Sequence, residues 1–199
     1  MPERVVHILP EQVASQIAAG EVVERPASAV KELAENSLDA GAHAITVEIE
    51  AGGTELIIVA DDGCGMGRED ALLSLRRHAT SKVRDVSDLA AIRSFGFRGE
   101  ALASIASVAH LRMQTRRPTD QHGIELTAHG GEVEHVGACA IAPGTRIEVR
   151  KLFYNTPARL KFMKTAATEQ SAVAEALQRL ALANWRVAFR LIAGSRTLF

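Results

Sequence analysis

The sequence predicts an α/β protein, and three observations support this prediction. The first is a helical segment at Arg25–Ala42. The second is a pair of apolar strands at Ile45–Ile49 and Leu56–Ala60, of which the first alternates as a half-buried strand does. The third is the stretch Leu111–Val149, where turn residues separate three or four strands that we expect to be antiparallel. The sequence contains no internal repeat and no low-complexity segment, so we expect a mixture of helices and strands throughout.

The helix at Arg25–Ala42 is predicted from its ends and from its apolar spacing. Pro26 suits the first helical position, where its missing N–H costs nothing, and Gly41 suits the C-terminal cap. At about 100° per residue, one side of the helix is apolar or small. The residues on this side, which we expect to pack on the core, are Val30, Leu33, Ala34, Ser37 and Leu38.

The opposite side of this helix is polar. Glu32, Asn36 and Asp39 cluster within roughly 60° of one another around the helix axis. Two carboxylates that flank a carboxamide can hold a divalent metal and activate a water molecule. The alternative is an acidic face that contacts only solvent, and the helix alone does not decide between the two.

The remaining elements are predicted from apolar spacing and turn residues. We expect helices at Pro10–Ala19, Glu69–Arg76, Ser87–Ile92, Ala101–Val108 and Thr168–Ala183, with a basic loop or helix start at Phe153–Lys164. The predicted turns are at Gly52-Gly53, Pro118–Gly123, Gly130-Gly131, Pro143-Gly144 and Gly194-Ser195. Val187, Phe189 and Leu191 alternate as a strand, and Thr197–Phe199 begins a returning strand. Because an apolar strand cut short is an aggregation hazard, we expect the chain to be a fragment of a longer protein.

Composition narrows the class of protein. Of the 199 residues, 47% are hydrophobic and 24% charged, which is ordinary for a globular protein. A formal net charge of −1 argues against a strongly basic nucleic-acid module, although it leaves room for a local basic patch. Two cysteines are too few for a disulfide framework. Because no long apolar run and no signal-peptide pattern is present, we expect a cytoplasmic protein.

Two glycine-rich loops are candidates for ligand binding. Asp61–Gly65 follows a strand, where the backbone can approach a ligand closely, and its alternative is an ordinary tight turn. Phe95–Glu100 precedes a predicted helix, whose free N–H groups can bind phosphate, and its alternative is an ordinary helix cap. Neither loop has the pattern of a Walker A loop or of a dinucleotide fold, so nucleotide binding would use another type of site.

Seven segments together match one family in order and spacing. They are Gln16–Pro26, Lys31–Leu33, Glu35–Gly41, the Asp61-x-Gly63-x-Gly65 loop, Ala79–Lys82, Gly96–Leu102 and Phe153–Arg159. On these segments the chain resembles the MutL family of DNA mismatch repair proteins over essentially its whole length. That family belongs to a wider ATPase group with DNA gyrase B, the ninety-kilodalton heat-shock chaperones and the sensor histidine kinases. The segments Gly96–Leu102 and Asn155–Arg159 distinguish this chain from those relatives.

The resemblance implies a fold and a chemistry. The fold would be an α/β sandwich of the Bergerat type, in which helices cover one face of a mixed, mostly antiparallel sheet. Glu32 would be the general base that aligns water against the γ-phosphate of ATP, and Asn36 would be the ligand of Mg²⁺. Asp61 would accept a hydrogen bond from the adenine amino group. Mg²⁺ prefers hard oxygen ligands and is usually held by few protein groups plus phosphates and water, which suits a neutral carbonyl at Asn36.

The resemblance assigns the remaining nucleotide contacts by position. Gly65 would let the base lie flat, Thr145 would support it, and residues 80–82 would belong to a lid over the site. The full set of implied nucleotide-binding residues is Asn36, Asp39, Asp61, Gly65, Met66, Thr80, Ser81, Lys82, Gly96, Phe97, Arg98, Gly99, Glu100, Ala101, Leu102 and Thr145. Asp62 is a departure, because the family most often has Asp-Asn-Gly at this loop. We expect the extra charge to leave the chemistry unchanged.

The implied function is that of a slow ATPase whose nucleotide state switches dimerisation and contacts with mismatch-repair partners. We expect residues 1–199 to form the ATP-binding domain, without the second subdomain that supplies a γ-phosphate lysine and without the C-terminal dimerisation domain. The partners would be a mismatch-recognition protein and a downstream nuclease or helicase. The full-length protein would be a homodimer and this fragment a monomer, located in the cytoplasm and at the nucleoid when acting on DNA.

Alternatives remain for both the function and the DNA contact. A scaffold that has lost hydrolysis is disfavoured by the presence of both Glu32 and Asn36, whereas the ATPase module of a related topoisomerase or chaperone is the second candidate. A kinase would need a phospho-accepting histidine domain, which the chain does not show. Weak, non-specific DNA binding through a basic patch is possible, although a solvated face is the simpler interpretation. The patch comprises Arg150, Lys151, Arg159, Lys161 and Lys164.

Overall fold

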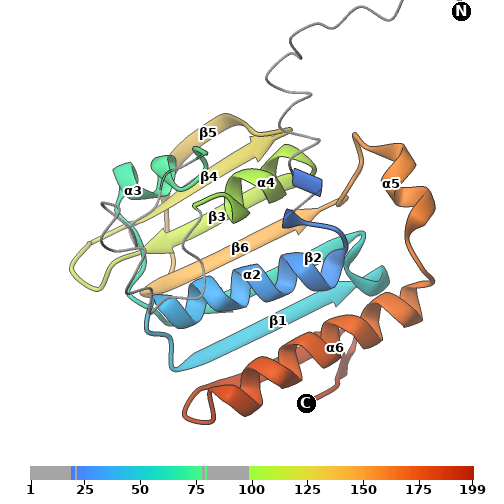
Figure 1. The fold of residues 1–199 in the computed structure, drawn as a ribbon. Coiled ribbons are helices and arrows are strands. Elements are labelled where there is room, and N and C mark those ends of the chain that lie inside the picture. Colours follow the sequence, from blue (N-terminus) through green and yellow to red (C-terminus); the bar gives the residue numbers. More distant parts are fainter. Residues whose placement is uncertain (1–18, 21, 78, 80–98) are drawn as a thin grey trace, which may run out of the picture.

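A single eight-stranded sheet with helices on one face forms the framework of the molecule (Figure 1). The structure, a computed structural model, describes residues 19–20, 22–77, 79 and 99–199. The predicted helices at Pro10–Ala19 and Ser87–Ile92 lie outside these residues apart from Ala19, which is helical. The fold implied by the resemblance, a mixed and mostly antiparallel sheet with helices on one face, is confirmed.

Helix α2 spans Pro26–Asp39 and confirms the prediction for this segment. Pro26 lies in the first turn, and Gly41 just beyond the helix adopts a left-handed φ of +73°. The predicted core side is buried at Val30, Leu33, Ala34 and Ser37, whereas Leu38 is only partly buried. Glu35 is also buried, where its carboxylate pairs with Lys31 at 2.9 Å.

The strands that follow α2 form the centre of the sheet. Strand β1 spans Ala44–Glu50, and it buries alternate side chains as predicted. A short 3-10 helix, η1 at Ala51–Gly53, makes the turn into β2 at Leu56–Asp61. Both sides of β2 are buried from Leu56 to Val59, as expected for an interior strand.

The stretch predicted as three or four antiparallel strands contains four. They are β3 at His110–Arg116, β4 at Gly123–His129, β5 at Glu132–Cys139 and β6 at Gly144–Arg150. The three predicted turns lie between them. Strands β7 (Ala188–Ala193) and β8 (Arg196–Thr197) form the final hairpin, also as predicted.

The strand order is β5-β4-β3-β6-β2-β1-β7-β8. All neighbours are antiparallel except β1 and β7, which run parallel, and the long helix α6 at Ala166–Ala183 directly precedes β7. Strand β6 pairs with both β2 and β3, so Thr145 lies opposite Asp61 on one side and opposite Thr115 on the other. This pairing brings three residues from distant parts of the chain to one end of the central strands.

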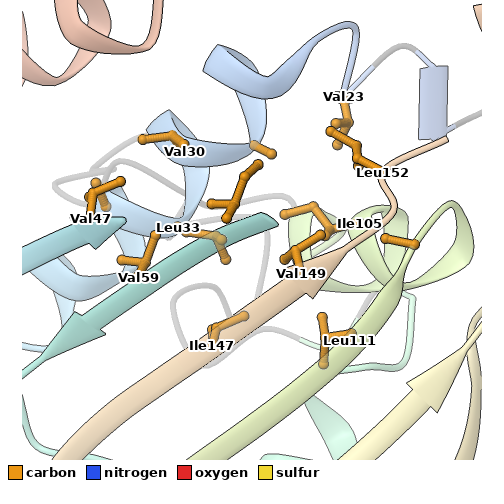
Figure 2. Packing of buried hydrophobic residues seen from close by; sticks show 14 of the residues in the cluster. Val23, Val30, Leu33, Val47, Val59, Ile105, Leu111, Ile147, Val149 and Leu152 are labelled. Carbon is orange, nitrogen blue, oxygen red and sulfur yellow. The ribbon is translucent and has the colours of Figure 1, made fainter. Parts of the chain in front are cut away.

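Helix α3 spans Arg68–Leu73, α4 spans Ala101–Ser107, and α5 spans Pro157–Phe162 within the segment expected to be a loop or helix start. Helices α3 and α4 are shorter than predicted, whereas α6 begins at Ala166, slightly before its predicted start, and ends at Ala183 as predicted. Helices α2, α4 and α6 lie on the same face of the sheet (Figure 1). Beneath them, apolar side chains of the helices and of strands β1, β2, β3 and β6 form one core, in which Leu33, Val59, Ile105 and Val149 are nearly inaccessible to solvent (Figure 2).

Candidate functional site

Asp61 ends strand β2, and donors from α2 and from the following loop hold its carboxylate. The Ser37 hydroxyl of α2 donates to Oδ2 at 2.7 Å, and the backbone N–H of Gly63 donates to Oδ1 at 2.9 Å. Burial raises the pKa of Asp61, and the charge of Asp62 raises it further, whereas the bonds from Ser37, Gly63 and Thr145 act in the opposite direction. An ionised carboxylate can accept about four hydrogen bonds in all, so the Asp61 carboxylate has capacity for a further donor from a ligand.

The loop after Asp61 is packed against the end of α2. The Cys64 N–H donates to the carbonyl of Ala40 at 2.9 Å. A β-carbon at Gly63 would lie 2.8 Å from the β-carbon of Ala40, which is closer than real side chains approach. This close approach brings the C-terminal end of α2 and the candidate adenine-binding loop together.

The far side of the same loop is packed against strand β3. Gly65 has a φ of +63°, and a β-carbon there would lie 2.1 Å from the carbonyl oxygen of Arg116. The next residue, Met66, donates its N–H to the Thr115 hydroxyl at 2.9 Å, and the hydroxyls of Thr115 and Thr145 are 3.0 Å apart. Glycine is therefore required at position 65 by the protein itself, in addition to any requirement of a ligand.

The polar side of α2 adjoins this loop. Glu32, Asn36 and Asp39 are each partly buried, so the interpretation as a fully solvated acidic face is not supported. Lys31 Nζ lies 3.8 Å from the Glu32 carboxylate and 2.9 Å from that of Glu35. Ser37, which contacts Asp61, follows Asn36 directly, so the candidate metal ligand is one residue along α2 from a contact of the candidate adenine acceptor.

The second glycine-rich loop is described only in part. Gly99 has a φ of +61°, Glu100 precedes helix α4, and Ala101 and Leu102 are its first residues. All four are partly buried, and α4 packs against α2. Six predicted site residues lie outside the described part of the chain: Thr80, Ser81, Lys82, Gly96, Phe97 and Arg98.

Asp62, the departure from the family pattern, is directed away from this site. Its Oδ1 accepts the backbone N–H groups of His43 at 2.7 Å and Ala44 at 2.9 Å, at the start of β1. The bond from Ala44 is the main reason that the pKa of Asp62 is lowered. The extra carboxylate therefore stabilises the connection from α2 to β1.

Two contributors to the site were missed by the sequence reasoning. Ser37 was assigned to the core side of α2 and is indeed 3% exposed, but its hydroxyl contacts Asp61. Thr115 was not singled out, although it links the Met66 backbone to Thr145. A serine on an otherwise apolar helix side was the available signal for Ser37, because a buried hydroxyl needs a partner.

The chemistry of the donor set fits Mg²⁺ bound jointly with phosphates. Among the residues that the structure describes, no group of three or more His, Cys, Asp or Glu side chains is placed to hold a metal ion. The carboxamide of Asn36 supplies a hard oxygen on the polar side of α2, and Mg²⁺ commonly takes one or two protein ligands with the rest from phosphate and water.

The predicted basic patch is divided by internal contacts. Arg150 Nε donates to the Glu148 carboxylate at 2.5 Å. Arg159 donates to the Val23 carbonyl at 3.3 Å and lies over the ring of Phe153. The other three residues, Lys151, Lys161 and Lys164, are exposed. Because two of its five cations have internal partners, the patch is a weaker candidate for DNA contact than its sequence indicated.

Comparison with known proteins assigns the chain to a family. Residues 24–151 match the model of the histidine kinase-, DNA gyrase B-, and HSP90-like ATPases. The chain belongs to this ATPase family. The matched residues include α2, the loop after Asp61, helix α4 and Thr145.

Within this ATPase family, the chain is similar to MutL proteins. It is 55% identical to the DNA mismatch repair protein MutL of Geobacter sulfurreducens over all of the chain and 33% of that protein. It is also 55% identical to MutL of Pelobacter propionicus, again over all of the chain and 32% of that protein. The chain thus spans about one third of the length of these relatives. The resemblance to MutL is confirmed, and the topoisomerase or chaperone alternative is not favoured.

Solved structures agree with this assignment. The chain matches the Aquifex aeolicus MutL ATPase domain complexed with ADP at a TM-score of 0.75 and 34% identity, over 89% of the chain and 63% of that structure. It matches the N-terminal domain of a DNA repair protein at a TM-score of 0.78 and 27% identity, over 94% of the chain and 55% of that structure.

Among the described residues, no helix combines the length and the apolar character needed to cross a membrane.

Proposed function

We propose that the chain is the ATP-binding and slowly ATP-hydrolysing module of a DNA mismatch repair protein. The single observation that carries this proposal is the Asp61 carboxylate, which α2 and the glycine loop hold at the end of β2. The match to a MutL ATPase domain complexed with ADP supports nucleotide binding by this fold. The family assignment supports hydrolysis as its chemistry.

Asp61 recognises the adenine base in this proposal. Its carboxylate accepts a hydrogen bond from the adenine amino group. Thr145 supports the base, and Gly65 and Met66 lie against the adenine ring. Guanine has a carbonyl at the position of that amino group, so two acceptors would face each other in a partly dry pocket. Leaving both unsatisfied costs about 1–3 kcal/mol.

Glu32 and Asn36 act on the phosphates. Glu32 is the general base that aligns water against the γ-phosphate, and Asn36 holds Mg²⁺ together with the phosphates. The metal, when bound, neutralises charge on the phosphate oxygens. Asp39 and residues 96–102 contribute to the same nucleotide site, and residues 80–82 form a lid, as the resemblance implies.

The proposal includes an incomplete site and a monomeric chain. Residues 1–199 form the ATP-binding domain, and a second subdomain of the longer protein supplies a lysine to the γ-phosphate. Losing one charge-assisted contact removes about 1.5–3 kcal/mol. We therefore expect the 199-residue chain to hydrolyse ATP one to two orders of magnitude more slowly than the longer protein, because the activation barrier rises by about the same free energy. The remaining properties belong to the longer protein in this proposal. They are ATP-driven homodimerisation, contacts with a mismatch-recognition protein and with a repair nuclease or helicase, weak DNA binding, and a cytoplasmic, nucleoid-associated location.

Competition between nucleotides tests the adenine assignment. We expect ATP to displace a labelled ATP analogue from the chain at least about tenfold more effectively than GTP, because of the unsatisfied acceptors described above. Equal displacement by the two nucleotides would contradict the role of Asp61.

Variants of α2 separate binding from hydrolysis. In the longer protein, Glu32→Ala should bind ATP and dimerise but lose turnover, since the base acts only on the attacking water. Asn36→Ala should instead lose Mg²⁺-dependent binding. Binding is measured by calorimetry, dimerisation by sedimentation and turnover by phosphate release. Wild-type turnover in Glu32→Ala would show that the base is another residue.

A further inference from the structure

We propose that Ser37 is a positioning residue for adenine recognition, because its hydroxyl holds the Asp61 carboxylate in one orientation and in its ionised state. This inference rests on the proposed function, in which Asp61 accepts a hydrogen bond from the base. Ser37 does not itself need to touch the nucleotide.

The geometry gives the Ser37 hydroxyl two acceptors and only one hydrogen to donate. Asp61 Oδ2 is 2.7 Å away, whereas the Leu33 carbonyl in the preceding helical turn is 3.2 Å away. A short bond to an ionised acceptor is about twice as strong as a neutral one. The hydrogen is therefore directed to Asp61 while that carboxylate is ionised, and the Leu33 carbonyl becomes the alternative acceptor when Asp61 is protonated.

The two oxygens of Asp61 are held by different elements. Oδ2 accepts from α2 through Ser37, and Oδ1 accepts from the loop through the Gly63 N–H. Together these bonds oppose rotation of the carboxylate plane. Removing the Ser37 bond would take away the donor from α2, and Ser37 is itself 3% exposed.

The surroundings of Asp61 make this bond important for charge as well. Burial raises the pKa of Asp61, and the neighbouring Asp62 carboxylate adds to that effect. The bonds from Ser37, Gly63 and Thr145 are the opposing influences, of which that from Ser37 is the largest. Helix α2 and strand β6 thus contribute neutral donors, and Asp62 is the ionisable neighbour whose charge acts on Asp61. Loss of the Ser37 bond should therefore raise the pKa of Asp61 further.

The experiment compares Ser37→Ala with Ser37→Cys and with a matched control. A cysteine nearly preserves the volume of serine but is a weak donor. Ser107→Ala is the control, because Ser107 is similarly buried at 4% exposure and donates to a helical carbonyl in α4. Carboxyl NMR titration of the nucleotide-free chain measures the pKa of Asp61. Calorimetry with ATP and with GTP across pH measures nucleotide affinity.

We expect Ser37→Ala to raise the pKa of Asp61 above its wild-type value, Ser37→Cys to raise it by less, and Ser107→Ala to leave it unchanged. The pH at which ATP affinity falls on acidification should move upward by the same amounts. The preference for ATP over GTP should fall by up to about tenfold in Ser37→Ala. A structural loss alone would reduce affinity without moving this pH.

Either of two results would overturn the inference. One is a folded Ser37→Ala with the wild-type pKa of Asp61, and the other, should Ser37→Ala not fold, is a Ser37→Cys with that same wild-type pKa. Failure of the proposed function gives a different result, in which the wild-type chain shows no preference for ATP over GTP. The titration without nucleotide still measures the Ser37–Asp61 bond in that case.

Discussion

Replacing Gly65 with alanine should separate the packing of the adenine loop from the general cost of a left-handed residue. A β-carbon at this position would lie 2.1 Å from the Arg116 carbonyl oxygen, whereas real contacts do not fall below 3.0 Å. The loop must therefore move by about 0.9 Å, the difference between these two distances, because the obstacle is backbone of strand β3. Overpacking of this kind costs about 1–3 kcal/mol.

Gly194 provides the matched control for this substitution. Its φ of +59° is close to the +63° of Gly65, but a β-carbon there meets no atom within 4 Å. Both alanine variants carry the cost of a left-handed non-glycine residue, about 1–2 kcal/mol. Only Gly65→Ala adds the collision, so it should lower the free energy of unfolding by about 2–5 kcal/mol, against about 1–2 kcal/mol for Gly194→Ala.

Urea unfolding and nucleotide binding measure the two consequences. Movement of the loop should also break the bond from Met66 to Thr115, which is 2.9 Å long, and should weaken ATP binding by at least about tenfold. Gly194→Ala should bind ATP as the wild type does. Equal losses of stability and unchanged ATP affinity in the two variants would refute the argument that β3 positions the adenine loop.

Two further predictions concern buried carboxylates. Glu169 of α6 is 1% exposed and pairs with Arg25 at 2.9 Å, so Glu169→Gln should lower the free energy of unfolding by about 1–3 kcal/mol. The control is Glu175→Gln, which affects an exposed pair with Arg179 on the same helix and should lower it by less than about 0.5 kcal/mol. Similar losses in urea unfolding would contradict this difference. The raised pKa of Asp61 means that the folded state binds the proton of this carboxyl more tightly than the unfolded state does. The wild type should therefore lose stability relative to Asp61→Asn as the pH rises from 3.8, the ordinary pKa of aspartate, through the raised pKa. A constant difference across this pH range in unfolding experiments would show that burial does not penalise the charge.

The secondary structure was largely predictable because its signals are local. The apolar side of α2 repeats every three to four residues, and β1 alternates, so each period identifies its element before any contact is known. The ends were less accurate, as in α3, which ends at Leu73 although the prediction continued to Arg76. Helix ends depend on hydrogen bonds of the last turn, which spacing does not describe.

Candidate site residues could be proposed from the sequence where they lie in a recognisable motif. Residues that belong to the site only through a tertiary contact could not. Glu32, Asn36 and Asp61 belong to segments that resemble a family, so their positions could be assigned from the chain alone. Ser37 was assigned to the core, because its position on the apolar side of α2 is all that the sequence shows. The extra charge of Asp62 was noticed, but the two backbone groups that it binds were not predictable.

The sequence by itself determined most of the elements, since these depend on neighbours within a few positions, and it determined the family through the order and spacing of its motifs. Tertiary structure alone decided which residues touch. Ser37 and Asp61 are 24 positions apart, and Met66 and Thr115 are 49 apart. Such pairs form only when β6 lies between β2 and β3 and α2 packs across them. Burial in that assembly, which no local pattern encodes, also raises the pKa of Asp61.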